Sequence, residues 1–121
     1  MLDKTIPFYH IIMRCDRVLP MEIKLPKGYV IRAYQPGDED AWAALECAIG
    51  EFPTADEALS AFCSRYLADP ELARERVFFA VSPEGEIVGT AIAWEHDPRG
   101  MGVRALHWVA VREDHQRKGL G

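Results

Sequence analysis

The stretch LHWVAVREDHQRKGLG, residues 106–121, is an apolar run that passes directly into a basic segment punctuated by glycines. The apolar half favours an extended strand. In the second half, Gly119 and Gly121 allow the backbone to approach an anion closely, and Arg117 and Lys118 add positive charge. A helix that began after these residues would point the positive end of its dipole at the same place. The pattern therefore indicates a phosphate site at the end of a strand.

This stretch resembles the signature of the GCN5-related N-acetyltransferase (GNAT) superfamily, which is Gln/Arg-x-x-Gly-x-Gly/Ala after a strand that often ends in an apolar-Ala-Val triplet. Here the triplet is Val109-Ala110-Val111 and the loop runs from Gln116 to Gly121. The resemblance covers roughly residues 29–121 and is most specific from Leu106 onward. A P-loop would need Gly-Lys-Ser/Thr, and a Rossmann fingerprint would need three glycines early in a βαβ unit. An ordinary basic turn after a strand is the alternative.

The resemblance implies an enzyme that binds acetyl-CoA and passes the acetyl group directly to an amine in a ternary complex. One backbone N–H of the strand would polarise the thioester carbonyl, as an oxyanion hole does. Backbone groups of the triplet would pair with the pantetheine arm, and the loop would hold the pyrophosphate. The cofactor-binding residues implied in this way are Val109, Ala110, Val111, Gln116, Arg117, Lys118, Gly119, Leu120 and Gly121.

The candidate catalytic base is His107, because an amine must lose a proton before it can attack. Alternation along a strand places His107 on the same face as Val109, and an imidazole titrates near neutral pH. The arrangement His-x-apolar-Ala-Val resembles the serotonin N-acetyltransferase branch, in which a strand histidine relays the proton. A half-buried histidine that packs beside Trp108 is the alternative reading, and Glu95 and His96 are weaker candidates for the base.

The first half of the resemblance contains two expected helices after a strand at residues 29–34. The first helix begins at Asp38 as N-cap and ends at Gly50, and the second begins at Thr54 with a capping box. In GNAT enzymes the connection between these helices often lines the acceptor pocket. Glu51 and Phe52 are therefore candidate substrate contacts, with solvated loop residues as the alternative.

Three further strands are expected at residues 77–81, 86–94 and 103–111. The order strand, helix, helix and three strands predicts a mixed α/β layered domain (α+β) with a mainly antiparallel sheet. This is a GNAT-like fold with two helices between strands 1 and 2, and its second half is absent. The strand at 103–111 is apolar on both alternating sets, which predicts that both of its faces are covered.

Composition supports one compact domain. The chain has 121 residues, 49% of them hydrophobic, and its net charge of -5 disfavours a general nucleic-acid binder. The cysteines show no metal or disulfide spacing, so Cys47 and Cys63 are expected to be buried, reduced thiols. No metal site is expected. No apolar run is long enough to cross a membrane, and we expect a cytoplasmic protein.

The domain boundaries predict an N-terminal arm or extra strand at residues 1–28 and the N-terminal portion of a GNAT domain at 29–121. A fragment or disrupted reading frame, a trimmed terminus, and a short protein completed by another chain are three open explanations of the end at Gly121. In this form we expect poor acetyl-CoA binding, no activity, and self-association through the edge of strand 103–111 or through Ile6–Met13. The alternative function is a non-catalytic CoA-binding or protein-interaction module with a GNAT-like core.

Overall fold

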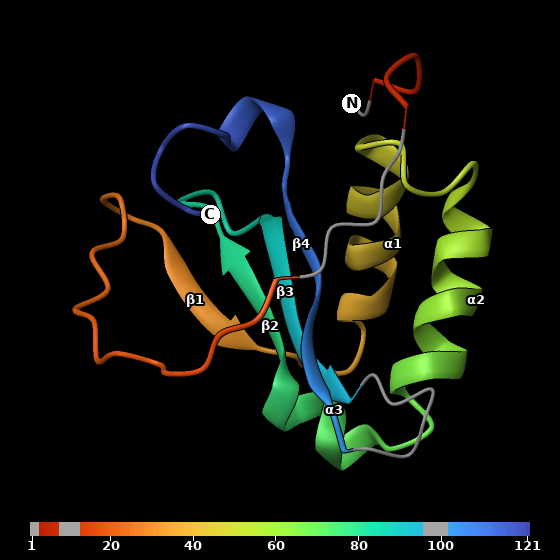
Figure 1. Cartoon of the computed structure of the whole chain (residues 1–121). Helices are drawn as coiled ribbons and strands as arrows, with labels where there is room; N and C mark the ends of the chain where they lie inside the picture. The colour runs from red at the N-terminus through yellow and green to blue at the C-terminus, as the bar shows by residue number, and fades with distance from the viewer. Residues whose placement is uncertain (1–2, 8–12, 96–101) are drawn as a thin grey trace.

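The computed structural model describes residues 3–7, 13–95 and 102–121, and their secondary structure follows the expected order. Figure 1 shows a sheet with two long helices beside it and a short helix at its lower end. The weaker candidate base His96, most of the segment 6–13 and the connection 96–101 lie outside the described residues. The elements are β1 (Val30–Ala33), α1 (Asp38–Ala48), α2 (Ala55–Tyr66), α3 (Pro70–Arg76), β2 (Val77–Val81), β3 (Ile87–Glu95), β4 (Arg104–Val111) and the 3-10 turn η1 (Glu113–His115).

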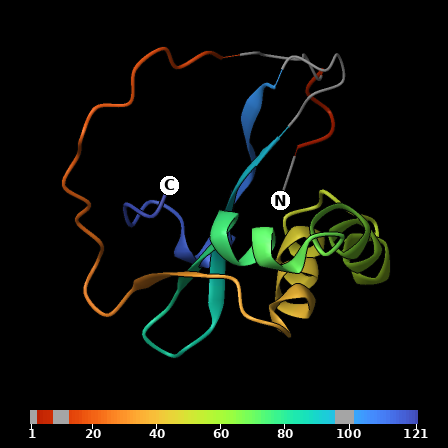
Figure 2. The same cartoon turned by 90° about the horizontal axis from the view of Figure 1, so that it is seen from below.

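The sheet has the order β1-β2-β3-β4, and each neighbouring pair is antiparallel. Helices α1 and α2 lie side by side on one face of it (Figures 1 and 2). The mixed, mainly antiparallel fold predicted from the sequence is confirmed. Gly89 on β3 lies close to its neighbours, since a Cβ there would be 3.2 Å from both the Ala110 carbonyl oxygen and the Ala80 Cβ. A glycine is therefore needed for the central strands to pack at this point.

The helix boundaries follow local capping chemistry. Thr54 accepts a hydrogen bond from the Glu57 N–H, which confirms the predicted start of α2. Helix α1 ends before Gly50, which has a φ of 90°. Its predicted N-cap is wrong by one residue, because Gly37 is the N-cap and Asp38 is the first helical residue. The Asp38 carboxylate instead binds the Arg32 guanidinium through two hydrogen bonds of 2.6 and 2.9 Å.

A third helix, α3, lies between the first two strands where the sequence predicted only two helices. Asp69 is its N-cap and accepts a hydrogen bond from the Leu72 N–H, and Pro70 occupies the first helical position. Proline is well suited to this position because its missing N–H has no helical partner there. Because a proline is equally compatible with the end of the preceding helix, the sequence did not reveal this helix of seven residues.

The core lies between α1, α2 and one face of the sheet and is built largely from aromatic side chains. The Trp42 ring lies 5.0 Å from Phe62 and 5.7 Å from Trp108, and Tyr66 lies 4.9 Å from Trp94. Edge-on and tilted pairs of this kind stabilise a core beyond the area they bury. The helix face of the sheet is thus fully packed, as the helical spacing of the aromatics predicted.

The opposite face of the sheet is open in the described residues. Leu106 and Val109 of β4 are 68% and 55% exposed, and Phe78 of β2 is 37% exposed. The expectation that β4 is covered on both faces is therefore wrong for this part of the chain. The expectation for the cysteines is also wrong in part, because Cys63 is exposed and Cys47 is only half-buried.

The described part of the N-terminal region contains neither helix nor strand. Residues 13–24 are exposed throughout, and the segment arcs away from the domain on the side of the sheet opposite α1 and α2 (Figure 2). The expectation of an arm or an extra strand at residues 1–28 stays a prediction. No helix among the described residues is long and apolar enough to span a membrane. The same residues contain no cluster of three side chains that could hold a metal ion.

Candidate active site

The end of β4 carries a β-bulge at the centre of the predicted site. His107 pairs with Ile92 and Ala110 pairs with Thr90, so two residues of β4 lie opposite the single residue Ala91. Within the bulge, Trp108 has a φ of 47°. A left-handed conformation is costly for a bulky residue, and it persists only where the surrounding structure enforces it. Here the aromatic core contacts of Trp108 supply that constraint.

The bulge overturns the simple alternation expected along this strand. His107 contacts Tyr66 of α2 and Trp108 contacts Trp42 of α1, so both side chains lie on the helix face. Val109 is exposed, whereas Ala110 is buried. His107 therefore shares its face with Ala110, and the prediction that it shares a face with Val109 is wrong. A bulge shifts every later side chain by one position, and nothing in the sequence marked it.

The imidazole of His107 is half-buried and its Nδ1 lies 3.3 Å from the Tyr66 hydroxyl. Tyr66 is 1% exposed, and burial raises the pKa of its hydroxyl against the opposing effect of Arg65. The hydroxyl therefore stays protonated near neutral pH and can orient the ring by a hydrogen bond. Tyr66 was assigned only to the core by its helical spacing, and the sequence contained no signal for this second role.

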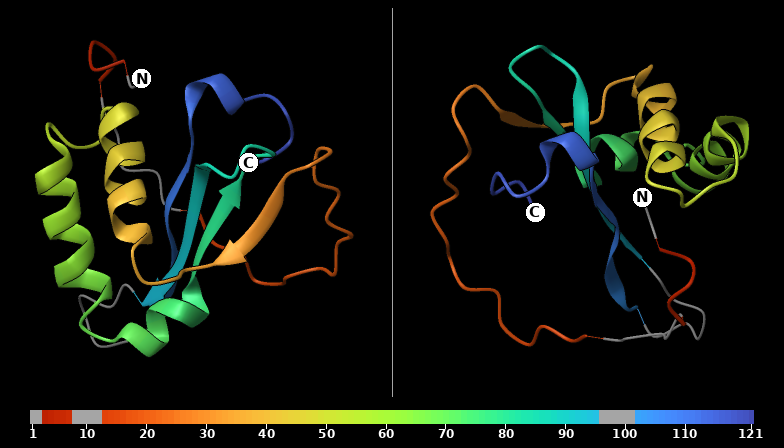
Figure 3. Two further views of the ribbon diagram at one scale, coloured as in Figure 1. Left: turned by 180° about the vertical axis from the view of Figure 1, so that it is seen from behind. Right: turned by 90° about the horizontal axis from the view of Figure 1, so that it is seen from above.

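The predicted phosphate loop begins after η1 and curls to the side of the sheet opposite the two helices (Figure 3). The Gln116 side chain donates a hydrogen bond of 2.9 Å to the Val111 carbonyl and closes the base of the loop. Arg117 has a φ of 57° and Gly119 a φ of 85°. Residues with positive φ beside residues with negative φ are typical of backbone turns that can bind anions. The loop lines a hollow of about 300 Å³ together with Val111 and His115.

The charges around the loop are arranged differently from the sequence expectation. Arg112 pairs with Asp114 at 2.8 Å and with Glu86 at 2.9 Å, so its charge is already balanced. His115 was expected to cap or solvate the loop, but it is 9% exposed and its ring is held by neighbouring side chains. Arg117 and Lys118 are exposed. A role for Arg117 and Lys118 in binding an anion stays a prediction.

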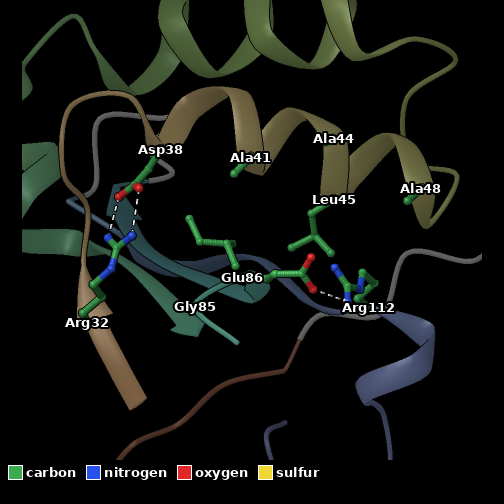
Figure 4. Close-up of a pocket in the computed structure, with 10 residues that line it drawn as sticks. Arg32, Asp38, Ala41, Ala44, Leu45, Ala48, Gly85, Glu86 and Arg112 are labelled. Carbon is green, nitrogen blue, oxygen red and sulfur yellow. Dashed lines mark hydrogen bonds and ion pairs between the residues drawn. The ribbon is translucent and has the colours of Figure 1, made fainter. Parts of the chain in front are cut away.

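A larger hollow of about 570 Å³ lies between α1 and the turn from β2 to β3 (Figure 4). The ion pairs Arg32–Asp38 and Arg112–Glu86 flank it, and small side chains of α1 form its wall. Each of these four charged residues belongs to one of the two ion pairs. This arrangement offers no reactive group, and the hollow contains none of the residues predicted from the sequence.

The connection between α1 and α2 contains both predicted substrate contacts. Glu51 is exposed, whereas the Phe52 ring packs 6.0 Å from Trp42 and 5.3 Å from Trp108. Phe52 thus joins the helix connection to the bulge of β4 and brings the predicted acceptor loop beside the predicted base strand. A role in substrate binding stays a prediction for both residues.

Glu46 is an unexpected titratable group close to this connection. It is fully buried, and neither of its carboxyl oxygens has a hydrogen-bond partner among the described residues. Burial, with a smaller effect of Glu51, raises the pKa of Glu46 to about 8. A buried carboxyl of this kind avoids the cost of an unpaired charge by keeping its proton. Glu46 was not identified from the sequence.

Comparison with known proteins identifies the family of the chain. The acetyltransferase (GNAT) family matches residues 39–121, and the chain belongs to this family. A GCN5-related N-acetyltransferase from Sphaerobacter thermophilus is 31% identical, with a TM-score of 0.59 over 79% of this chain and 29% of that one. No curated protein was found to match.

A protein from Pyrococcus horikoshii described as an acetyltransferase shares the fold, with a TM-score of 0.62 and 19% identity over 84% of this chain. That comparison covers 33% of the Pyrococcus horikoshii chain. The chain thus spans about a third of the length of each of these solved structures. Both comparisons agree with the α+β topology derived above.

Proposed function

We propose that this chain forms the acyl-CoA side of an N-acetyltransferase that transfers an acetyl group from acetyl-CoA to a primary amine. One observation carries the proposal: the bulged end of β4 leads through the short turn η1 into the glycine-containing basic loop. Among the described residues, Trp108 and Arg117 are the non-glycine residues with positive φ, and they lie on either side of this junction. Unusual backbone held in place by its surroundings is often found at functional sites.

The loop would hold the phosphates of the donor. Arg117 and Lys118 are exposed, Arg117 lines the hollow, and a Cβ built on Gly119 would have no atom within 4 Å. Phosphate oxygens bind backbone N–H groups and basic side chains, and charge-assisted hydrogen bonds are about twice as strong as neutral ones. The exposed cations and the curled backbone therefore fit a pyrophosphate.

The backbone of β4 would hold the pantetheine arm and the thioester. β4 is the last strand of the described sheet, so its outer edge offers backbone donors and acceptors. The side chains of Val109, Ala110 and Val111 matter little for such contacts. One N–H aimed at the thioester oxygen would stabilise the charge that develops there, a contribution of about 3 kcal/mol in enzymes where it has been measured.

The acyl transfer needs a proton acceptor on the amine. The amine nitrogen attacks the thioester carbonyl carbon, the C–S bond breaks, and CoA leaves as a thiolate that takes up a proton. His107 would accept the proton of the amine, and the Tyr66 hydroxyl at 3.3 Å would orient its ring. A positioned base of this kind contributes typically 10²- to 10⁴-fold.

Two measurements test the function. Calorimetry of the complete polypeptide with acetyl-CoA should show binding, and its thiol release should be screened over polyamines, amino acids, aminoglycosides and peptide N-termini, whereas the 121-residue form is expected to bind poorly and to show no activity. Turnover with any of these amines supports the transferase. CoA binding without turnover favours the binding-module alternative, and the absence of both contradicts the proposal.

The base is tested separately. His107→Gln should lower the rate at least tenfold near neutral pH and leave acetyl-CoA affinity almost unchanged. The rate loss should shrink as the pH rises, because more of the amine is then already deprotonated. A pH–rate profile identical to that of the unchanged protein would assign His107 to packing alone.

A further inference from the structure

Tyr29 makes a contact that joins the beginning of the domain to the phosphate loop. Its hydroxyl lies 2.7 Å from the Nδ1 of His115, a residue 86 positions later in the chain. The two rings meet edge to face, with centroids 5.8 Å apart. His115 is 9% exposed, so this contact is nearly shielded from water. The loop is thereby attached to the segment that enters β1.

The second ring nitrogen of His115 defines the direction of the hydrogen bonds. The Arg112 Nη2 lies 3.0 Å from His115 Nε2, and a guanidinium can only donate. Nη2 has two N–H groups and also contacts Asp114 and Glu86, so Nε2 accepts a share of one of these N–H groups, and the proton of a neutral His115 ring is then on Nδ1. The Nδ1–H consequently donates to the Tyr29 hydroxyl oxygen. The Asp114 carboxylate, 3.5 Å from Nε2, is more distant than Arg112.

Arg112 is itself fixed and supports His115. Its guanidinium donates to both carboxylate oxygens of Asp114, at 2.8 and 3.1 Å, and to Glu86 at 2.9 Å. Hydrogen bonds to Asp114 and then to Glu86 raise the pKa of Arg112 above its ordinary value. With its charge balanced, Arg112 acts as a fixed donor that orients the imidazole.

Tyr29 also contacts the loop beyond His115. The Lys118 Nζ lies 3.4 Å from the Tyr29 hydroxyl oxygen and 6.0 Å from the centre of its ring. One tyrosine thus contacts the residue before the loop and a cation within it. A phosphate oxygen is a stronger acceptor for an ammonium group than a phenol oxygen is. Lys118 can therefore turn from Tyr29 to a phosphate while Tyr29 retains His115.

We propose that Tyr29 is a positioning residue for the acyl-CoA phosphate loop: it fixes His115 and keeps Lys118 beside the anion-binding backbone. The inference rests on the proposed function, because it takes the anion to be the pyrophosphate of acyl-CoA. Tyr29 lies outside the superfamily signature at 116–121. Its effect is preorganisation, since a loop that is already formed does not have to be ordered when the ligand binds.

The test compares two tyrosines that each lose one hydroxyl. Tyr29→Phe removes the partner of His115 and Lys118, whereas Tyr34→Phe removes a hydroxyl that donates to Glu39 at 2.7 Å, away from the loop. Calorimetry should show about tenfold weaker acetyl-CoA binding for Tyr29→Phe, because a buried N–H loses its partner. Tyr34→Phe should change the affinity less than twofold. S-acetylpantetheine, which lacks the pyrophosphate, should bind both variants equally.

A second readout needs no ligand. The ¹⁵N shifts of the His115 ring should show a protonated Nδ1 in the unchanged protein, and Tyr29→Phe should alter these shifts and those of the amides at 116–121. Unaltered ring and loop signals would overturn the positioning role, as would equal acetyl-CoA affinity in the two variants. Altered signals with no acetyl-CoA binding by the unchanged protein would support the role of Tyr29 and contradict the proposed function.

Discussion

The aromatic core under α1 and α2 is held by different forces from the segment 112–121, which contains η1 and the predicted phosphate loop. The core is fixed by ring packing, such as the 5.0 Å pair Trp42–Phe62. The loop is fixed by directional contacts, such as the 2.7 Å hydrogen bond between Tyr29 and His115. β4 belongs to both regions, because Trp108 enters the core and Val111 borders the loop. Changes in the core should therefore alter stability, and changes in the loop should alter binding.

The largest effect is expected from removing a core ring. Phe62 is fully buried, so Phe62→Ala should lower the free energy of unfolding by about 3–5 kcal/mol. Phe78 on the open face of the sheet is the matched control, and Phe78→Ala should cost much less. Urea denaturation of both variants measures the difference. Equal losses would mean that the two faces of the sheet do not differ in packing.

The next effect is expected from Glu46, and its size depends on pH. The pKa of Glu46 in the folded protein is about 8 and lies above the ordinary value of 4.5. At pH values between these two, the carboxyl keeps its proton in the folded protein and loses it on unfolding. Stability contributed by this group is present at low pH and falls as the pH rises, by about 1.4 kcal/mol per unit. Glu46→Gln should remove this dependence, so it should be the more stable form near pH 8 and gain nothing near pH 4.

Thermal unfolding across this pH range measures the effect, with the exposed Glu75 providing the control variant Glu75→Gln. The control should keep the pH dependence of the unchanged protein. A Glu46→Gln variant that follows the same curve as the unchanged protein would show that Glu46 is not the buried acid described here.

A smaller loss of stability is expected when either of two glycines with nearly equal φ is replaced. Comparing the two variants separates effects on binding from effects on stability. Gly119 in the loop and Gly85 in the β2–β3 turn have φ of 85° and 86°, and neither has an atom within 4 Å of a built Cβ. Alanine at either position should cost about 1–2 kcal/mol of stability through backbone strain. Only Gly119→Ala should also weaken acetyl-CoA binding in calorimetry. If both variants bind equally well, the loop does not hold the ligand.

The smallest effect on stability concerns the open face and edge of β4. Self-association of the chain through this edge stays a prediction. Leu106 is 68% exposed, so Leu106→Lys should change the free energy of unfolding by no more than about 0.5 kcal/mol. The added charge should nevertheless reduce any self-association seen by light scattering. A stable monomer in the unchanged protein would contradict the prediction at once.

Much of the fold could be predicted because its signals are local. Within a few residues, the local sequence indicates the start of α2 at the Thr54 capping box, the end of α1 before Gly50, and the strand formed by the apolar run at 77–81. The short helix α3 was missed because Pro70 is compatible with both the end of one helix and the start of another. The exposed face of β4 was missed because apolar alternation shows what a strand could bury and not what lies against it.

The sequence by itself determined the family and the strand that leads into the glycine-containing basic loop, because glycines and basic residues at fixed spacing act through the backbone next to them. Tertiary structure alone decided the face of His107, since the bulge at Trp108 exists only when β4 pairs with β3 and packs on α1. It also decided the roles of Tyr29, Tyr66 and Glu46. The partners of Tyr29 and Tyr66 are distant in sequence, and the Glu46 carboxyl has no hydrogen-bond partner among the described residues. Burial and hydrogen-bond geometry become defined only when distant segments meet.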